Sequence, residues 1–355
     1  MSLEKWGDAG LLDRELELLL RLSNSYNKLY ILSYSSNKEK EKNLIPESYS
    51  KKINIVCKPT LIPNSRIFNY LYVFLMFFVN FKVFYIASVI RSNQFSGIFP
   101  GVMASLLARK PLVARSGFHF TNTALYEKGF IYHILMTMWQ KLIILSSKKV
   151  ICSAPLHYSD LVKKYGVKKV KYVPNFISSY DFGNSPVEKN DRVLVCGRFT
   201  EQKNYYLLIV AAYLSNLKLN IVVDKAYHQR IKRFSSEMGV DIELILPCAN
   251  KDLIYMMRSC FAFLQIPLYE GMPKTLLEAM YNCKNVITWD VEGIDESILY
   301  GQNVTIVKPS DFHSLVNALI LFPKGGGEGN IPSLDKSSNS IESVHKQTIS
   351  ILNEC

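Results

Sequence analysis

The first half of the sequence has few acidic residues. Residues 1–180 hold 25 Lys and Arg but only 10 Asp and Glu. Within residues 51–180 there are 18 basic side chains and only two acidic ones. Residues 181–355 hold 17 basic and 20 acidic side chains, so the basic excess belongs to the first half. Such a segment suits an acidic partner (anionic lipid, a lipid diphosphate or nucleic acid), or it is a solvated basic surface.

The sequence also lacks paired cysteines and familiar metal or phosphate motifs. Its 7 cysteines form no C-x-x-C pair, and most lie in apolar runs, which favours small core residues in a reducing compartment. We find no Walker loop and no Asp-x-Asp pair after a strand, so we expect no metal. We expect no secretory leader, because the first apolar residues follow a charged, helical pattern.

No uncharged apolar run is long enough for a typical membrane span. The stretch 67–81 is apolar nearly all round but falls short of the roughly 18 residues required. It predicts either a buried helix or one lying in the membrane interface. Residues 130–145 predict a second apolar helix, and lysines cluster between residues 163 and 171.

The length and the order of the predicted elements indicate two domains of α/β class. Strands and helices alternate from residue 192 to 289, which predicts a parallel sheet with helices on both faces. We predict domains at 1–177 and 192–323, a linker at 178–191, and a flexible segment with a C-terminal helix within 324–355.

The first domain begins with a helix where a doubly wound domain normally begins with a strand. Leucines between positions 11 and 22 predict an amphipathic helix, and a strand follows at 29–34. We therefore expect the first domain to lack its first strand, as a late start or a truncation would produce.

One stretch joins a buried strand to an apolar helix through a turn that holds Glu270, Gly271 and Pro273. The unpaired N–H groups and the dipole of a helix start suit a phosphate, and Pro273 suits the first helical position. Glu270 and Glu278 are anionic, so they are better partners for hydroxyl groups than for an anionic phosphate. A nucleotide sugar carries both kinds of group.

A second turn follows the first strand of the second domain. Gly197 permits a tight turn there, and Arg198 with Lys203 can neutralise a diphosphate. Taken alone, such cations are usually solvated. The turns after strands one and four of a doubly wound sheet open on the same edge, however, so both turns can face one ligand.

These two turns resemble a known family. Residues 270–280, EGMPKTLLEAM, resemble the E-x7-E signature of the retaining family-4 glycosyltransferases of GT-B fold, within the glycosyl transferases group 1. Residues 197–204, GRFTEQKN, resemble the family's phosphate-binding segment, and parts of the first half resemble a bacterial surface-polysaccharide branch. The resemblance implies two Rossmann-like domains facing a cleft.

The resemblance also implies roles for individual residues. Arg198 and Lys203 hold the diphosphate, Glu270 contacts the transferred sugar, Glu278 contacts the ribose hydroxyls, and His119 faces the donor sugar. The whole implied donor-binding set is Gly197, Arg198, Lys203, Glu270, Gly271, Met272, Pro273, Lys274, Thr275 and Glu278. The implied catalytic set is Glu270, Arg198, Lys203 and His119.

The expected function is transfer of a sugar, with retention, from a nucleotide-diphosphate sugar to a lipid-linked glycan during surface polysaccharide assembly. We expect no cofactor or metal, and a cytoplasmic protein held peripherally at the inner face of the cell membrane. Alternatives are another GT-B enzyme such as a nucleotide-sugar epimerase or phosphorylase, and a non-catalytic sugar- or lipid-binding subunit. Nucleic acid is disfavoured because no aromatic-basic motif accompanies the charge.

Overall fold

The computed structural model of the chain describes residues 2–63, 65–178, 180, 188, 190–291, 303–309, 311–321 and 338–355. The chain divides into two compact units: unit 1 is Met1–Phe176 with Ser338–Cys355, and unit 2 is Ile177–Ser337. Most of the predicted linker and of the predicted flexible segment lies outside the described residues. Every strand pairing in both units is parallel, which confirms the predicted α/β class.

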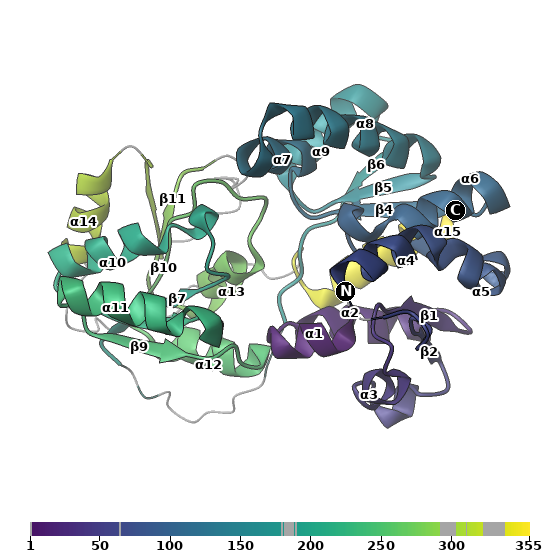
Figure 1. Ribbon diagram of the computed structural model, residues 1–355. Coiled ribbons are helices and arrows are strands. Elements are labelled where there is room, and N and C mark those ends of the chain that lie inside the picture. Colours follow the sequence, from purple (N-terminus) through teal and green to yellow (C-terminus); the bar gives the residue numbers. More distant parts are fainter. Residues whose placement is uncertain are drawn as a thin grey trace. The chain divides into compact units, whose positions relative to one another are not determined.

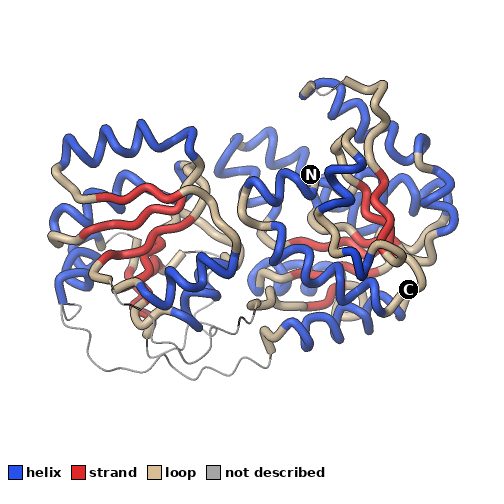
Figure 2. The backbone as a smooth tube through the Cα atoms, turned by 90° about the horizontal axis from the view of Figure 1, so that it is seen from below, coloured by secondary structure: helices blue, strands red, loops and turns tan. Residues whose placement is uncertain are grey.

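Unit 2 contains one parallel sheet with helices on both of its sides (Figures 1 and 2). Its strands are β7 (Arg192–Cys196), β8 (Lys218–Val222), β9 (Ile242–Ile245), β10 (Ala262–Gln265), β11 (Val286–Trp289) and β12 (Val304–Val307). Its described helices are α10 (Tyr205–Leu214), α11 (His228–Met238), α12 (Asn250–Ser259), α13 (Lys274–Asn282) and α14 (Phe312–Leu321). The strand order is β12-β11-β10-β7-β8-β9, so the direction of winding reverses between β7 and β10.

The central strands of unit 2 are apolar on both faces because helices cover both. Val193 and Leu194 in β7 and Phe263 in β10 are 0% exposed. Such continuous burial is typical of parallel strands in α/β proteins, where alternation between polar and apolar residues is absent.

The strands of unit 1 form two separate sheets. Its strands are β1 (Leu29–Leu32), β2 (Ile53–Val56), β3 (Ile90–Arg91), β4 (Leu112–Ser116), β5 (Lys149–Cys152) and β6 (Val170–Tyr172). One sheet has the order β1-β2 and the other the order β3-β4-β5-β6. In Figure 1, β1 and β2 lie apart from β4, β5 and β6.

Ten helices of unit 1 surround these sheets in the described part of the chain. They are α1 (Leu3–Asp8), α2 (Leu12–Asn24), α3 (Lys38–Asn43), α4 (Arg66–Val79), α5 (Phe81–Ile86), α6 (Phe99–Ala108), α7 (Phe120–Lys128), α8 (Phe130–Ser146), α9 (Pro155–Tyr165) and α15 (Ile341–Asn353). Helices α1 and α2 are the first described elements, and β1 follows them.

Helix α4 corrects one of the two interpretations of the apolar stretch at 67–81. The Ser65 hydroxyl caps the helix, and the next helix begins directly after Asn80. Tyr72 and Phe77 are buried, but Phe74 and Phe78 on the other side are 55% and 56% exposed. The interpretation as a buried helix is therefore wrong, because one face of α4 has no protein cover in unit 1.

Helix α15, near the end of the chain, packs in unit 1. Ile351 and Leu352 join a core cluster that includes Leu18 and Leu22 of α2. The segment leading into α15 is also fixed, because the Asn339 side chain donates to the carbonyl oxygen of Asn175 at 2.8 Å. Unit 1 is therefore closed by residues from both ends of the sequence.

We predict that Ile351→Ala destabilises unit 1. The side chain is 6% exposed, and its truncation should lower the free energy of unfolding by about 2–4 kcal/mol through lost burial and a residual cavity. Denaturant titration followed by hydrogen exchange in each unit measures the effect. Ile320→Ala on α14, where the side chain is 48% exposed, serves as the control and should change little. Equal effects of the two variants would contradict the prediction.

Candidate functional site

The strand order of unit 2 places two turns at one edge of the sheet. Strands β7 and β10 are adjacent and parallel, with Val193 opposite Ala262 and Leu194 opposite Phe263. Their carboxyl ends therefore open on the same edge, at the point where the winding reverses. Ligands of open α/β sheets bind at such switch points.

The turn after β7 is held by aromatic side chains. Gly197 has a φ of 155°, and its carbonyl oxygen accepts a hydrogen bond of 2.6 Å from the Tyr205 hydroxyl. Phe199 stacks on Tyr227 with ring centroids 4.9 Å apart, and the Arg230 guanidinium lies 5.6 Å from the Phe199 ring centroid. These contacts fix the backbone on either side of Arg198.

Three polar contacts join this turn to the turn after β10. The backbone N–H of Leu268 donates to the Gln202 carbonyl oxygen, and the Gln202 side chain donates to the Tyr269 carbonyl oxygen, both at 2.8 Å. The Lys203 ammonium group forms an ion pair with the Glu270 carboxylate. Both side chains of this pair are mostly covered, with exposures of 13% and 11%. The structure thus brings together the cation of one predicted motif and the carboxylate of the other.

Helix α13 starts beside this ion pair without a side-chain cap. Pro273 was predicted at the first helical position, but it lies one residue before the helix, which begins at Lys274. Its φ of −68° fits a helix, whereas its ψ of 124° is extended. The N–H groups in the first turn of any helix have no partner within the helix. The turn that holds Gly271 and Met272 leads directly into this helix start. A phosphate group at this edge would therefore meet the N–H groups of the first helical turn and also the positive end of the α13 helix dipole.

Arg198 is exposed at the same edge. Within the described residues its guanidinium forms no ion pair. A guanidinium without a carboxylate partner can grip a diphosphate through two parallel hydrogen bonds.

Glu278 lies inside α13 and is 0% exposed. Its carboxylate accepts a hydrogen bond of 3.1 Å from the Asn250 side chain, whose own oxygen accepts one of 2.9 Å from the Tyr180 hydroxyl. The contact of Glu278 with ribose hydroxyls stays a prediction. Asn250 is not among the residues predicted for the site, although an asparagine at the first residue of a helix is a recognisable signal.

His119 belongs to unit 1 and so is not among the residues that unit 2 brings together. It precedes α7, and its Nε2 lies 3.0 Å from an oxygen of Asp160. Its ring packs 4.8 Å from the ring of His157, which is buried and lies 3.2 Å from the Ser116 hydroxyl. His119 therefore stands at the carboxyl end of β4 in a small polar cluster.

Arg115, to which the sequence pattern assigns no role, organises the same end of the second sheet of unit 1. Its guanidinium donates to the Asn93 carbonyl oxygen at 3.2 Å, to the Ser153 hydroxyl at 3.2 Å and to the Asn175 side chain at 3.0 Å. Burial lowers the pKa of Arg115. The cation thus links the end of β4 to the segments that follow β3, β5 and β6.

No three His, Cys, Asp or Glu side chains gather as a metal site in the described part of the chain. All seven cysteines are free, and the sulfur atoms of buried Cys260 and Cys283 lie 3.8 Å apart.

Residues 177–330 match the family described as Glycosyl transferases group 1. This range covers most of unit 2 and includes both turns. No curated protein sequence matches the chain significantly.

Solved structures with similar folds extend the comparison to both units. Sucrose-phosphate synthase from Thermosynechococcus elongatus superposes with a TM-score of 0.76 at 16% identity, covering 97% of this chain and 93% of that one. HepE of Anabaena, solved with UDP and glucose, gives 0.71 at 15% identity, with 96% and 95% covered. The lipopolysaccharide outer core galactosyltransferase WaaB gives 0.64 at 16% identity, with 97% and 95% covered. The chain has the GT-B fold, with two Rossmann-like domains.

The buried His157 predicts a dependence of stability on pH. Burial, reinforced by the neighbouring His119, lowers the pKa of His157 to about 3. An unfolded histidine has a pKa of about 6.5, so between these values only the unfolded chain binds the proton. The stabilising effect of neutral His157 is complete above pH 6.5 and should fall by about 1.4 kcal/mol for each pH unit below it.

Denaturant unfolding at pH 7 and pH 5 measures this effect. We predict that His157→Gln, which cannot gain the proton, flattens the pH dependence, while the control His313→Gln at an exposed position of α14 leaves it unchanged. The same slope in His157→Gln and in the unaltered protein would show that another group controls acid stability.

Proposed function

We propose that the protein is a glycosyltransferase that takes its sugar from a nucleotide-diphosphate sugar. The family match of unit 2 and the similarity to glycosyltransferase structures support this function. The observation that carries the proposal is the contact of Lys203 with Glu270 at the switch point between β7 and β10. It joins a phosphate-binding turn to a carboxylate turn beside an uncapped helix start.

The chemistry of this reaction fits the groups at that edge. Breaking the bond between sugar and phosphate leaves positive charge at the anomeric carbon and negative charge on the departing diphosphate. Preorganised cations and N–H groups strongly stabilise the negative charge that develops on the diphosphate. Arg198, Lys203 and the start of α13 supply them. We assign the contact with the sugar to Glu270, which pairs with Lys203.

We further propose that the reaction retains the configuration of the sugar and needs no metal, as the family resemblance implies. Uridine diphosphate sugars are the first donors to test, because HepE was solved with UDP and with UDP-glucose.

The acceptor that we propose is a lipid-linked glycan, and its support lies in an apolar surface of unit 1. Large side chains on the outer sides of α4 and α8, here called the apolar face, are 41% to 77% exposed. On α4 they are Ile67, Phe68, Tyr70, Leu71, Phe74, Leu75, Phe78 and Val79, and on α8 Phe130, Ile131, Ile134, Leu135, Met138, Leu142 and Leu145. Apolar patches of this kind mark interaction sites in proteins.

The two helices of the apolar face are connected through α6. The Phe74 ring of α4 lies 4.6 Å from the Phe99 ring of α6, which in turn stacks 5.9 Å from Trp139 of α8. Exposed Lys82 and Lys141 lie on α5 and α8 and are close in sequence to the apolar residues. Exposed apolar side chains with nearby lysines suit the interface of an anionic bilayer.

Within the described residues, no helix combines the length and the hydropathy that crossing a membrane requires. We propose peripheral attachment through the apolar face, at the cytoplasmic side of the cell membrane, where a lipid-linked acceptor would be within reach.

We predict that Arg198→Ala and Glu270→Ala each lower kcat by about 10²–10³-fold, the loss typical when one stabilising group is removed from a transition state. Release of nucleoside diphosphate is measured with a panel of nucleotide sugars and lipid-linked glycans. The control Arg233→Ala removes an exposed arginine of α11 that pairs with Glu237, and it should leave the rate unchanged.

Equal rates in Arg198→Ala, Glu270→Ala and the unaltered protein would refute the site assignment. Donor binding in calorimetry without turnover on any acceptor would instead favour a non-catalytic sugar-binding subunit.

We predict that Leu75→Ser with Phe78→Ser weakens binding to vesicles of phosphatidylglycerol and phosphatidylethanolamine by about tenfold or more, because two exposed apolar anchors of α4 are lost. Cosedimentation measures the bound fraction. Leu214→Ser on α10 of unit 2, where the side chain is 51% exposed, is the matched control. Equal losses in both variants, or binding that the variants leave intact, would contradict the role of the apolar face.

A further inference from the structure

His119 and Asp160 form a pair in unit 1 whose two members differ in exposure. The Nε2 atom of His119 lies 3.0 Å from an oxygen of the Asp160 carboxylate. The His119 side chain is 18% exposed, whereas the Asp160 side chain is 51% exposed. His119 follows β4, and Asp160 lies on α9, which follows the neighbouring strand β5. The pair therefore joins the segments that leave two adjacent strands.

The surroundings of the His119 ring determine which of its nitrogen atoms carries the proton. The backbone N–H of Asn122, in the first turn of α7, donates to Nδ1 at 3.4 Å, so Nδ1 is an acceptor. In a neutral imidazole the other nitrogen is then the donor. The Nε2–H group therefore donates to the Asp160 carboxylate. With both nitrogens used in this way, the ring has no N–H group left for a ligand.

Packing holds the His119 ring in place. The ring of His157, which is 1% exposed, lies 4.8 Å from it, with the two planes 31° apart. The turn that leads to His119 is also fixed, because the N–H of Gly117 donates to the Gln94 side chain at 3.1 Å. A Cβ at Gly117 would lie only 3.0 Å from the Gln94 amide nitrogen, so glycine permits this close approach. The hydrogen bond from the fixed ring then orients the Asp160 carboxylate.

The exposed carboxylate of Asp160 is the polar group that this pair offers to a ligand. An ionised carboxylate has room for about four hydrogen bonds and only accepts them. Hydroxyl groups are suitable donors, whereas an anionic phosphate would be repelled by the like charge. The pair therefore suits the hydroxyl groups of a saccharide. Its place beyond the carboxyl ends of parallel strands is also where open α/β sheets bind ligands.

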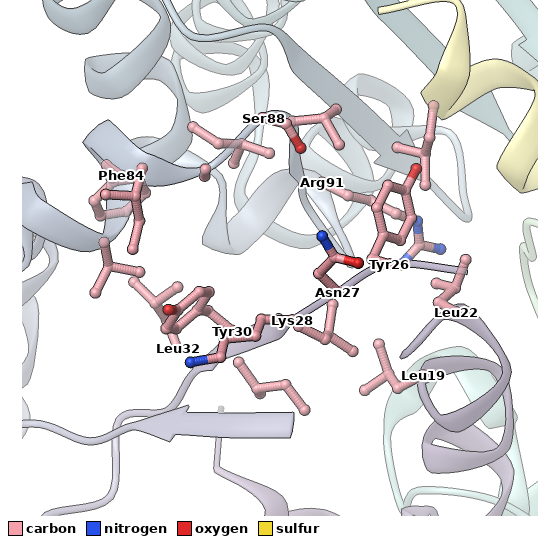
Figure 3. Close-up of a pocket in the computed structure, with 18 of the residues that line it drawn as sticks. Leu19, Leu22, Tyr26, Asn27, Lys28, Tyr30, Leu32, Phe84, Ser88 and Arg91 are labelled. Carbon is pink, nitrogen blue, oxygen red and sulfur yellow. The ribbon is translucent and has the colours of Figure 1, made fainter. Parts of the chain in front are cut away.

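A cavity of about 540 Å³ elsewhere in unit 1 lacks this chemistry. Figure 3 shows Tyr30, Leu32 and Phe84 around the open space. None of the described residues that line the cavity is an aspartate or a glutamate. Within the described part of unit 1, hydroxyl recognition is therefore better assigned to Asp160 than to this cavity.

We propose that Asp160 binds a hydroxyl group of the acceptor glycan and that His119 is a positioning residue that orients Asp160. The proposal rests on the proposed function, because an acceptor takes part only if the protein transfers a sugar. Arg198, Lys203 and Glu270, the groups assigned to the donor, all belong to unit 2, whereas this pair belongs to unit 1. His119 thus acts through Asp160 and does not contact the donor sugar through its ring nitrogens.

The kinetic test uses Asp160→Asn, which keeps the size of the side chain but replaces one carboxylate oxygen by an N–H donor. The KM for the acceptor should rise by about tenfold or more, because a hydrogen bond to a charged group is lost. The KM for the nucleotide sugar should stay unchanged. His119→Phe, which keeps a ring without nitrogens, should raise the acceptor KM by about threefold or more. Rates are measured with the nucleotide sugar and lipid-linked glycan that react fastest in the panel described above.

The matched control is Glu47→Gln, which neutralises another exposed carboxylate of unit 1, in the segment before β2. It should change neither KM. Nitrogen-15 NMR of the His119 ring supplies a readout that needs no substrate. It should show the proton on Nε2 in the unaltered protein, and the Nε2–H signal should be lost through faster exchange with water in Asp160→Ala.

Unchanged kinetics in Asp160→Asn would overturn the acceptor role alone. A raised KM for the nucleotide sugar with an unchanged acceptor KM would also overturn it and place the pair at the donor. A proton on Nδ1 of His119 in the unaltered protein would overturn the positioning role. No turnover with any donor and acceptor would overturn the proposed function and the acceptor role together, while the NMR measurement still decides whether His119 orients Asp160.

Discussion

The parallel pairing of β7 with β10 is the constraint on which the proposed donor site depends. It makes two strands that are far apart in the sequence end side by side, so their turns share one edge of the sheet. The backbone contacts of Gln202 and the ion pair of Lys203 with Glu270 then fix the turns to each other. Residues that are 67 positions apart thereby become one site. The proposed binding of a phosphate group rests on this topology together with the helix that starts at Lys274.

The strands of unit 1 are divided between two sheets, whereas those of unit 2 form one. The cores of unit 1 are correspondingly divided: Leu16 and Ile53 pack in one cluster around β1 and β2, while Leu112 and Val150 pack in another around the second sheet. Helix α2 bridges the division, because Leu19 packs against clusters on both sides. Unit 1 therefore depends on helices for cohesion that unit 2 obtains from a continuous sheet. The same unit carries the apolar face.

The sequence predicted those features that depend on local pattern. The βα alternation gave the fold class, and the rule that turns after strands one and four share an edge anticipated the proximity of Lys203 and Glu270. The sequence was less informative about features that depend on how side chains pack in three dimensions. The composition of residues 67–81 does not reveal that Phe74 points outward while Phe77 is buried. The partner of Glu278 is supplied by α12, whose packing against α13 no local pattern encodes.

We propose that the diphosphate of a nucleotide sugar binds where the turns after β7 and β10 meet. Hydrogen exchange in the presence and absence of uridine diphosphate tests it most directly, because it reports binding residue by residue and needs no acceptor. We predict slower exchange at residues 197–204 and 271–276, with unchanged exchange in β9, the edge strand of the sheet of unit 2. Protection confined to other segments at saturating nucleotide would contradict it.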